Sequence, residues 1–159
     1  MAYDLLIQNG TVIDGTGAPQ RHADVAVADG RIVEVGKITT GATHVIDATD
    51  LSVVPGFVDP HTHYDAQIWW DPLVTCSSWH GVTTVVMGNC GVGIAPCRSQ
   101  QREALAWDLV NVEGMSFNVL SKGVTWQWES FPEFMQPRGV KGRALTWASS
   151  CRLLPSAPT

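Results

Sequence analysis

Two histidines, His61 and His63, are the residues of this chain whose type and spacing are best suited to chemistry. They follow residues 51–60, a largely apolar run that predicts a short buried strand ending where the histidines begin. Residues two apart on an extended backbone point to the same side, so both imidazoles are expected to face one point in space. Two neutral imidazoles that converge in this way suit a zinc-class metal ion.

Cys90 is a third candidate, because it follows a second predicted strand. Residues 81–88 are rich in β-branched side chains and end at Asn89-Cys90-Gly91. Ligand sites in α/β architectures gather at the carboxyl ends of parallel strands, and a thiolate with two imidazoles favours zinc. The residues alone leave a plainer interpretation open, in which the His-x-His spacing is fortuitous and Cys90 is a small buried apolar side chain.

Two aspartates, Asp59 and Asp65, flank the histidines. Either could orient an imidazole from behind the metal ligands, and either could equally be a turn or solvated carboxylate. The other cysteines and histidines have no comparable context and are interpreted as structural or surface residues: Cys76, Cys97, Cys151, His22, His44 and His80.

The first fifty residues predict a small antiparallel β domain, assigned to residues 1–52. Residues 5–13 alternate around Asn9-Gly10, and residues 23–35 alternate around Asp29-Gly30. Both dipeptides favour the type I′ turn of a two-residue hairpin. A further short strand is expected at residues 45–48.

From residue 53 the pattern changes to alternating strands and helices. Residues 53–58 are nearly all apolar, which is typical of a strand covered on both faces. Helices are expected within residues 64–80, 98–110 and 128–135, with the second strand at 81–88 between them. This alternation predicts parallel βα units. The tryptophans at 69, 70, 126 and 128 are expected to pack in the core rather than to line a substrate pocket.

The composition limits the classes of function. The chain has 159 residues, is 45% hydrophobic, and carries a formal net charge of −5. That charge argues against nucleic acid or an anionic membrane as partner, and no apolar run approaches the roughly 18 residues that span a bilayer. The start of the chain lacks the basic segment of a secretory signal, so the predicted compartment is the cytoplasm, where cysteines remain thiols or metal ligands.

Several motifs resemble one family closely. Residues 54–65, Val-Pro-Gly-Phe-Val-Asp-Pro-His-Thr-His-Tyr-Asp, resemble the first-strand metal motif of the amidohydrolase superfamily. Residues 81–97, Val112-Glu-Gly-Met-Ser and residues 126–133 resemble its N-acyl-D-amino-acid deacylase, or D-aminoacylase, branch. The resemblance covers about residues 3–136.

This resemblance implies an α/β protein. A small N-terminal β-sandwich portion would precede the first two or three βα units of an incomplete metal-dependent (β/α)8 barrel. It also implies hydrolysis of the amide bond of a small-molecule N-acyl-D-amino acid by a zinc-activated water. By position, Cys90 would be a ligand of the main zinc site, and the two histidines would hold a metal beside it, giving one or two zinc ions.

The resemblance also implies parts that this sequence does not contain. The family has two further histidine ligands and a catalytic aspartate on later barrel strands, and this chain has no histidine after His80. A closed barrel needs about 250 residues. The chain as written is therefore expected to be inactive alone. The alternatives are a cyclic amidase of the same superfamily and a non-catalytic metal-binding fragment.

The charge distribution changes abruptly near residue 137. Residues 1–137 carry six basic and fifteen acidic side chains, whereas residues 138–159 carry four basic and no acidic ones. The family resemblance ends at about the same place, after Gln136. We therefore interpret 53–137 as the partial barrel and 138–159 as an aberrant or divergent tail.

A frameshift near codon 137 predicts that a neighbouring reading frame restores the family motifs. Reading the coding DNA downstream in all three frames is expected to find the missing histidine ligands after a single-base shift. If the DNA sequence is confirmed and no shift of reading frame restores a ligand motif, the frameshift hypothesis fails and residues 138–159 are a naturally divergent tail.

Overall fold

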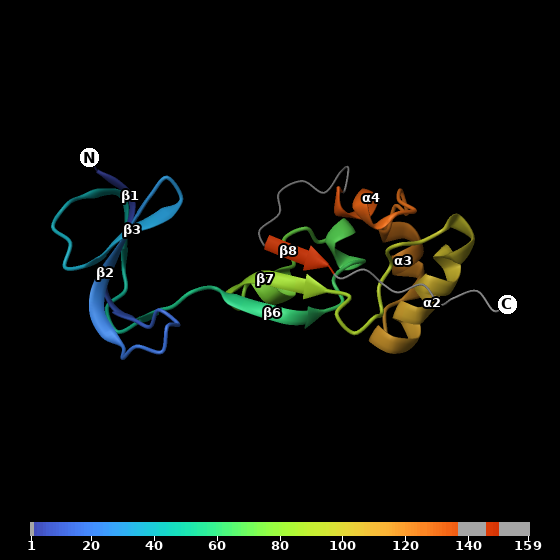
Figure 1. Ribbon diagram of the computed structural model, residues 1–159, viewed down its shortest axis with the longest axis horizontal. Helices are drawn as coiled ribbons and strands as arrows, with labels where there is room; N and C mark the ends of the chain where they lie inside the picture. The colour runs from blue at the N-terminus through green and yellow to red at the C-terminus, as the bar shows by residue number, and fades with distance from the viewer. Residues whose placement is uncertain (1, 137–145, 150–159) are drawn as a thin grey trace. The chain divides into compact units, whose positions relative to one another are not determined.

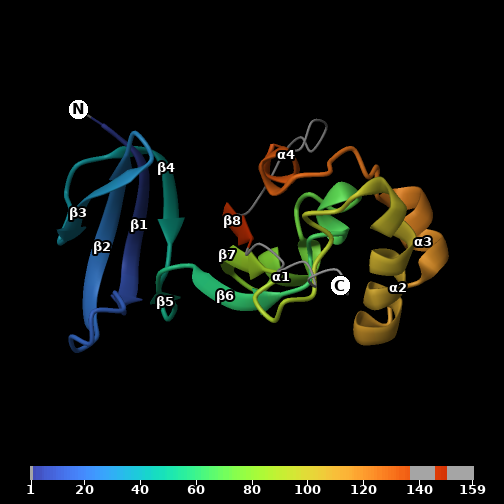
Figure 2. The same ribbon diagram turned by 45° about the vertical axis from the view of Figure 1, so that its right-hand side comes forward.

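The first part of the chain forms a five-stranded sheet. Its strands are β1 (Tyr3–Val12), β2 (Arg21–Ala28), β3 (Arg31–Gly36), β4 (Ala42–Asp47) and β5 (Ser52–Val53). They are arranged in the order β3-β2-β1-β4, with β5 also pairing with β1 (Figure 2). The β1–β2 and β2–β3 pairs are antiparallel, but β4 and β5 run parallel to β1. The sheet is therefore mixed rather than antiparallel throughout.

The computed structural model describes residues 2–136 and 146–149. Its two compact units are Met1–Pro55 and Gly56–Thr159. The predicted tail lies largely outside the described residues, as does Cys151.

The hairpin predicted around Asp29-Gly30 is confirmed. Asp29 and Gly30 have φ of 50° and 71°, as a type I′ turn requires, and they join β2 to β3. Val27 lies opposite Ile32 across this pair. The turn dipeptide and the alternation agree here, and the Asp29 N–H also donates to Asp4 Oδ2 of β1 at 2.7 Å.

The hairpin predicted around Asn9-Gly10 is wrong. Both residues lie inside β1, at a bulge where the pairing with β2 shifts register. Asn9 has φ of 63°, and its backbone N–H donates to Asp24 Oδ1 at 2.9 Å. A Cβ on Gly10 would come within 2.5 Å of a Val53 methyl, so the glycine allows close packing against β5 instead of a chain reversal.

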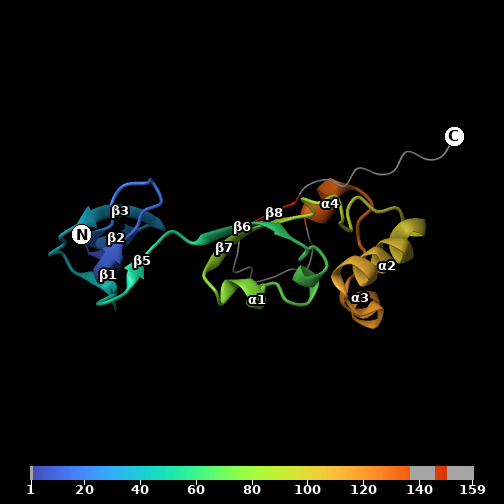
Figure 3. The same cartoon turned by 90° about the horizontal axis from the view of Figure 1, so that it is seen from below.

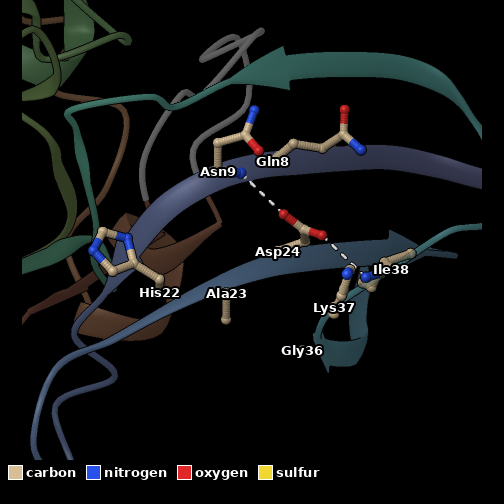
Figure 4. A pocket seen from close by; sticks show the side chains of 8 residues that line it. All are labelled: Gln8, Asn9, His22, Ala23, Asp24, Gly36, Lys37 and Ile38. Carbon is tan, nitrogen blue, oxygen red and sulfur yellow. Dashed lines mark hydrogen bonds between the residues drawn. The ribbon is translucent and has the colours of Figure 1, made fainter.

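A shallow polar pocket of about 410 Å³ lies on this sheet (Figure 4). Both carboxylate oxygens of Asp24 accept backbone hydrogen bonds there, one from Asn9 and one from Ile38 at 3.0 Å. Asp24 thus ties β1 and the segment after β3 to β2. The lining residues include none of the predicted metal ligands: Gln8, Asn9, His22, Ala23, Asp24, Gly36, Lys37 and Ile38.

The second unit is built on a parallel sheet. Its strands are β6 (Phe57–Thr62), β7 (Val82–Met87) and β8 (Thr146–Ser149), in the order β6-β7-β8 (Figure 1). Both pairs are parallel. The parallel pairing expected between the strand before the histidines and the strand before Cys90 is therefore confirmed.

The prediction of one buried strand at residues 53–58 is wrong. Val53 belongs to β5 of the first sheet, and β6 begins only at Phe57. Phe57 and Val58 are 58% and 61% exposed, so neither side chain is covered at the start of β6. At its other end, β6 continues through His61 to Thr62 and does not stop before the histidines.

Helices follow β6 and β7. They are η1 (Gln67–Trp69), α1 (Thr75–Ser78), η2 (Ser99–Gln101), α2 (Arg102–Glu113), α3 (Phe117–Gly123) and α4 (Phe131–Met135). The helix expected at 98–110 is confirmed, and those expected within 64–80 and 128–135 are shorter than predicted. Figure 3 shows α2 and α3 side by side. Within the described residues, no helix has the length and apolar character to cross a membrane.

Aromatic packing holds this unit together. Trp128 is 2% exposed, its indole N–H donates to the Ile94 carbonyl at 2.9 Å, and its ring stacks on Trp69 at 4.9 Å between centroids. Phe134 of α4 meets the same indole edge-on at 5.1 Å. The core role predicted for this pair of tryptophans is confirmed, whereas Trp70 is 40% exposed and lies over Gly123.

The other predicted structural residues lie as follows. Cys97 is buried in this core, as a structural cysteine should be, and Cys76 is exposed. The two histidines assigned to the surface, His22 and His44, are exposed, and His80 is exposed as well.

Replacing Gly56 with alanine is expected to destabilise the second unit by about 1–3 kcal/mol. A Cβ there would lie 2.1 Å from the Thr83 methyl, so β6 and β7 could not keep their spacing. Urea unfolding followed by circular dichroism measures the change. Gly41→Ala is the matched control, since nothing lies within 4 Å of its Cβ position. Equal stability of the two variants would contradict this account of the strand contact.

Candidate metal centre

Hydrogen bonds join the carboxyl ends of β6 and β7. The Thr62 hydroxyl donates to the Val86 carbonyl at 3.0 Å, and the Gly88 N–H donates to the Thr62 carbonyl at 3.4 Å. Beyond the strands, the Asn89 side-chain amide donates to the Pro60 carbonyl at 3.1 Å. These bonds fix the segment before Cys90 against the segment that carries the histidines.

The structure brings together all three residues predicted to bind metal. One ligand atom from each of His61, His63 and Cys90 lies within 4.8 Å of the others. Cys90 Sγ is 3.4 Å from His63 Nε2, and the two imidazole centroids are 5.5 Å apart. His61 and Cys90 are exposed, while the His63 side chain is only 15% exposed. Cys90 is therefore not the buried apolar side chain of the plainer interpretation.

This donor set fits zinc. Two imidazoles and one thiol are the borderline-soft ligands that zinc sites use. His63 Nδ1 is buried and has no hydrogen-bond partner among the described residues, so one nitrogen of this ring has a lone pair or proton that the protein does not satisfy.

The two flanking aspartates, Asp59 and Asp65, each accept a hydrogen bond from a backbone N–H. Asp59 Oδ1 accepts from the His61 N–H at 3.2 Å, which shapes the end of β6. Asp65 is 2% exposed, and its Oδ2 accepts from the Ile94 N–H at 2.8 Å. Gly93 permits this approach, because a Cβ there would lie 3.3 Å from the same oxygen.

Burial raises the pKa of Asp65 above its ordinary value. The Ile94 hydrogen bond and the neighbouring His63 lower this pKa, and Glu113 raises it, but the loss of solvent is the largest effect. Asp65 thus binds the loop after Cys90 through Ile94 and also interacts electrostatically with His63 and Glu113.

Glu113 is a site residue that the sequence analysis did not assign. Its Oε1 lies 3.3 Å from His63 Nε2, and its side chain is 25% exposed. It is the last residue of α2, directly before Gly114, whose φ of 65° ends the helix. A carboxylate in the last helical turn is unfavourable because it lies at the negative end of the helix dipole. This unfavourable position was the one feature of the sequence that could have pointed to Glu113.

Comparison with known proteins places these residues in a family. Residues 44–136 match the amidohydrolase family, which is more than half of the chain. The chain belongs to the amidohydrolase family. The matched segment contains all three residues of the candidate site as well as Glu113.

The amidohydrolases most similar in these comparisons include several deacylases. D-aminoacylase of Alcaligenes xylosoxydans xylosoxydans is 35% identical over 156 residues, which is 94% of this chain and 30% of the relative. N-acyl-D-aspartate deacylase of the same organism is 43% identical, over 62% of this chain and 20% of the relative.

Solved amidohydrolase structures give the same result. N-acyl-D-glutamate deacylase from Bordetella bronchiseptica, in complex with zinc and a phosphonate inhibitor, is 32% identical with a TM-score of 0.75. A D-aminoacylase crystal structure is 33% identical with a TM-score of 0.76. The two matches cover 96% and 94% of this chain but only 30% of each solved structure. It is a mixed α/β protein with neighbours in the amidohydrolase fold, and it spans about a third or less of their length.

Replacing Asp65 with asparagine is expected to stabilise the chain near neutral pH. The amide keeps an acceptor for the Ile94 N–H but carries no charge to bury. Because the folded pKa of Asp65 is raised, the unfolded state loses its proton first as pH rises, so the stability of the unmodified chain falls with pH.

The advantage of Asp65→Asn should therefore be small at pH 4 and grow toward pH 8. Urea unfolding in the presence of a chelator measures it across this range. A difference that stays constant with pH would contradict the raised pKa.

Proposed function

We propose that this chain carries the first part of the metal centre of a zinc-dependent N-acyl-D-amino-acid deacylase. The convergence of His61, His63 and Cys90 at the carboxyl ends of two parallel strands carries the proposal. Similarity to D-aminoacylase and to two N-acyl-D-amino-acid deacylases supports the substrate class, a small N-acyl-D-amino acid.

The finer architecture belongs to the same proposal. Residues 1–52 would be the N-terminal β-sandwich portion, residues 53–137 the beginning of a (β/α)8 barrel, and residues 138–159 a divergent tail. In its support, β6 and β7 are successive parallel strands that are each followed by helices, and the family match ends at residue 136. The whole protein would act in the cytoplasm, which accords with the free thiols of Cys76 and Cys90.

Each residue has a distinct task in this proposal. Cys90 and His63 supply two donor atoms that lie 3.4 Å apart, and His61 supplies a third from the end of β6. Asp59 binds the backbone N–H of His61, and Asp65 binds the backbone N–H of Ile94 in the loop after Cys90. When bound, zinc supplies a Lewis acid that polarises an amide carbonyl and activates water for attack.

The chain is expected to bind zinc, and Cys90→Ala is expected to abolish or strongly weaken that binding. The reason is that Cys90 contributes the only thiol of the cluster. Competition with a coloured zinc indicator gives both stoichiometry and affinity. Cys76→Ala is the matched control, because Cys76 is also an exposed free thiol but lies outside the cluster. Equal loss in both variants, or binding unaffected by Cys90→Ala, would refute the assignment.

The substrate class is tested in a chimera. Residues 57–136 of this chain replace the matching segment of D-aminoacylase, and zinc content and circular dichroism establish that the chimera is loaded and folded. It is expected to hydrolyse N-acetyl-D-amino acids and to spare the L-enantiomers. A folded, zinc-loaded chimera that prefers cyclic amides would favour the alternative amidase function.

A further inference from the structure

The carboxylates of the first sheet all lie on one of its two faces. Strands β1 to β4 contain one acidic residue each: Asp4, Asp24, Glu34 and Asp47. Paired residues point to the same side of a sheet, and successive residues of a strand point to opposite sides. Ala26 pairs with both Leu6 and Glu34, and Asp47 pairs with Gln8. This register places all four carboxylates on the face of Leu6.

The opposite face of the same sheet carries apolar side chains in two rows. The first row crosses all four strands through successive pairs: Val35, Val25, Ile7 and Ile46. The second row joins Ile32, Val27 and Leu5 and ends at His44. The sheet therefore has one acidic face and one apolar face, which we call the apolar face.

The apolar face is open to solvent along both edge strands. Ile32 and Val35 of β3 are 67% and 40% exposed, and Ile46 of β4 is 49% exposed, whereas Val25 at the centre is 5% exposed. The described residues of this unit form one sheet and so provide no second layer of their own (Figure 2). Because a sheet with one apolar face is stabilised by packing against another layer, this face is suited to an interaction.

The distribution of charge favours an identical face as the partner. Two copies stacked through their apolar faces would keep every strand carboxylate on the outside, so the negative charges of the two chains would not meet. Arg21, which pairs with Val12 beyond the first row, is neutralised by an ion pair with Asp14 at 2.8 Å. The stacking therefore buries apolar side chains without burying an unpaired charge.

We propose that the apolar face binds the apolar face of a second copy of this chain. Two sheets would stack about 10 Å apart around a two-fold axis, which closes the assembly at two copies. The dimer does not depend on the metal site, since none of its contacts involves the second unit.

The size of the apolar face predicts a weak dimer. Four strands about 4.8 Å apart and six residues of about 3.3 Å each give a projected area of about 400 Å² per copy. This is at the small end of specific interfaces, so association should be reversible and should depend on concentration.

Sedimentation equilibrium of the full 159-residue chain tests the proposal between about 10 and 500 μM. A chelator and a reductant are present, so that neither zinc nor the exposed thiols of Cys76 and Cys90 can bridge two copies. The average mass is expected to rise from that of one chain toward that of two. A monomer at every concentration would overturn the proposal and leave the face to a different partner. Masses above two chains would also overturn it, because they indicate open-ended pairing of strand edges.

Two neighbouring residues of β4 locate the contact. Ile46→Lys adds a charge to the apolar face of each copy and is expected to weaken the dimer at least about tenfold. Val45→Lys is the matched control, because Val45 is 55% exposed but pairs with Leu6 and so points to the acidic face. It should leave the dissociation constant within about twofold of that of the unmodified chain. Equal effects of the two substitutions would overturn the assignment of the face.

A variant on the other edge strand gives an independent measurement. Ile32→Lys changes the most exposed side chain of the apolar face, so it is expected to weaken the dimer while the fold is kept. Circular dichroism and urea unfolding establish that each variant is folded before its mass is measured. A folded Ile32→Lys variant that associates as tightly as the unmodified chain would contradict the proposal.

Discussion

The parallel pairing of β6 with β7 is the constraint on which the rest of the site depends. Asp59 pairs with Val85 and Thr62 with Met87, so the two strands end side by side. An antiparallel pair would place the histidines and Cys90 at opposite ends of the sheet. Two side-chain hydrogen bonds, from Thr62 and Asn89, then join the ends of the two strands and the segments that follow them.

This pairing is stabilised from one side by a core that has no direct part in chemistry. Val85 and Met87 are fully buried and belong to the same hydrophobic cluster as Ile94. The Trp128 indole N–H donates a hydrogen bond to the Ile94 carbonyl, and the Ile94 N–H donates one to the Asp65 carboxylate. One loop residue thus connects the aromatic core to the histidine segment, and the position of the donors follows from the packing of the unit.

Sequence reasoning succeeded where local pattern and long-range contacts agree. The Asp29-Gly30 turn and the strand before Cys90 depend on short-range geometry. The meeting of His61, His63 and Cys90 also needs the parallel pairing of β6 with β7, and metal binding by these three residues stays a prediction. It failed at Asn9-Gly10, where Asp24 and Asp47 hold the asparagine and Val53 crowds the glycine. Those partners are 15 to 43 positions away, beyond the reach of a turn rule.

The remaining failures have equally physical causes. Apolar character predicted burial for Phe57 and Val58, but burial depends on what packs against the faces of a strand, and both side chains are exposed. Glu113 lies 50 positions from His63, and nothing local in the sequence indicates which face of α2 meets the strand ends. Only the unfavourable position of a carboxylate at a helix end gave a hint.

The exposure of Cys90 has a consequence for the lifetime of the site. A thiol open to solvent is also open to oxidants, and its conversion to a sulfinic acid would remove the only sulfur donor of the cluster irreversibly for most proteins. An ion shared with His63 would shield that sulfur. A bound metal would therefore protect its own ligand, and Cys90 would be oxidised faster in the metal-free protein than in the metal-bound one.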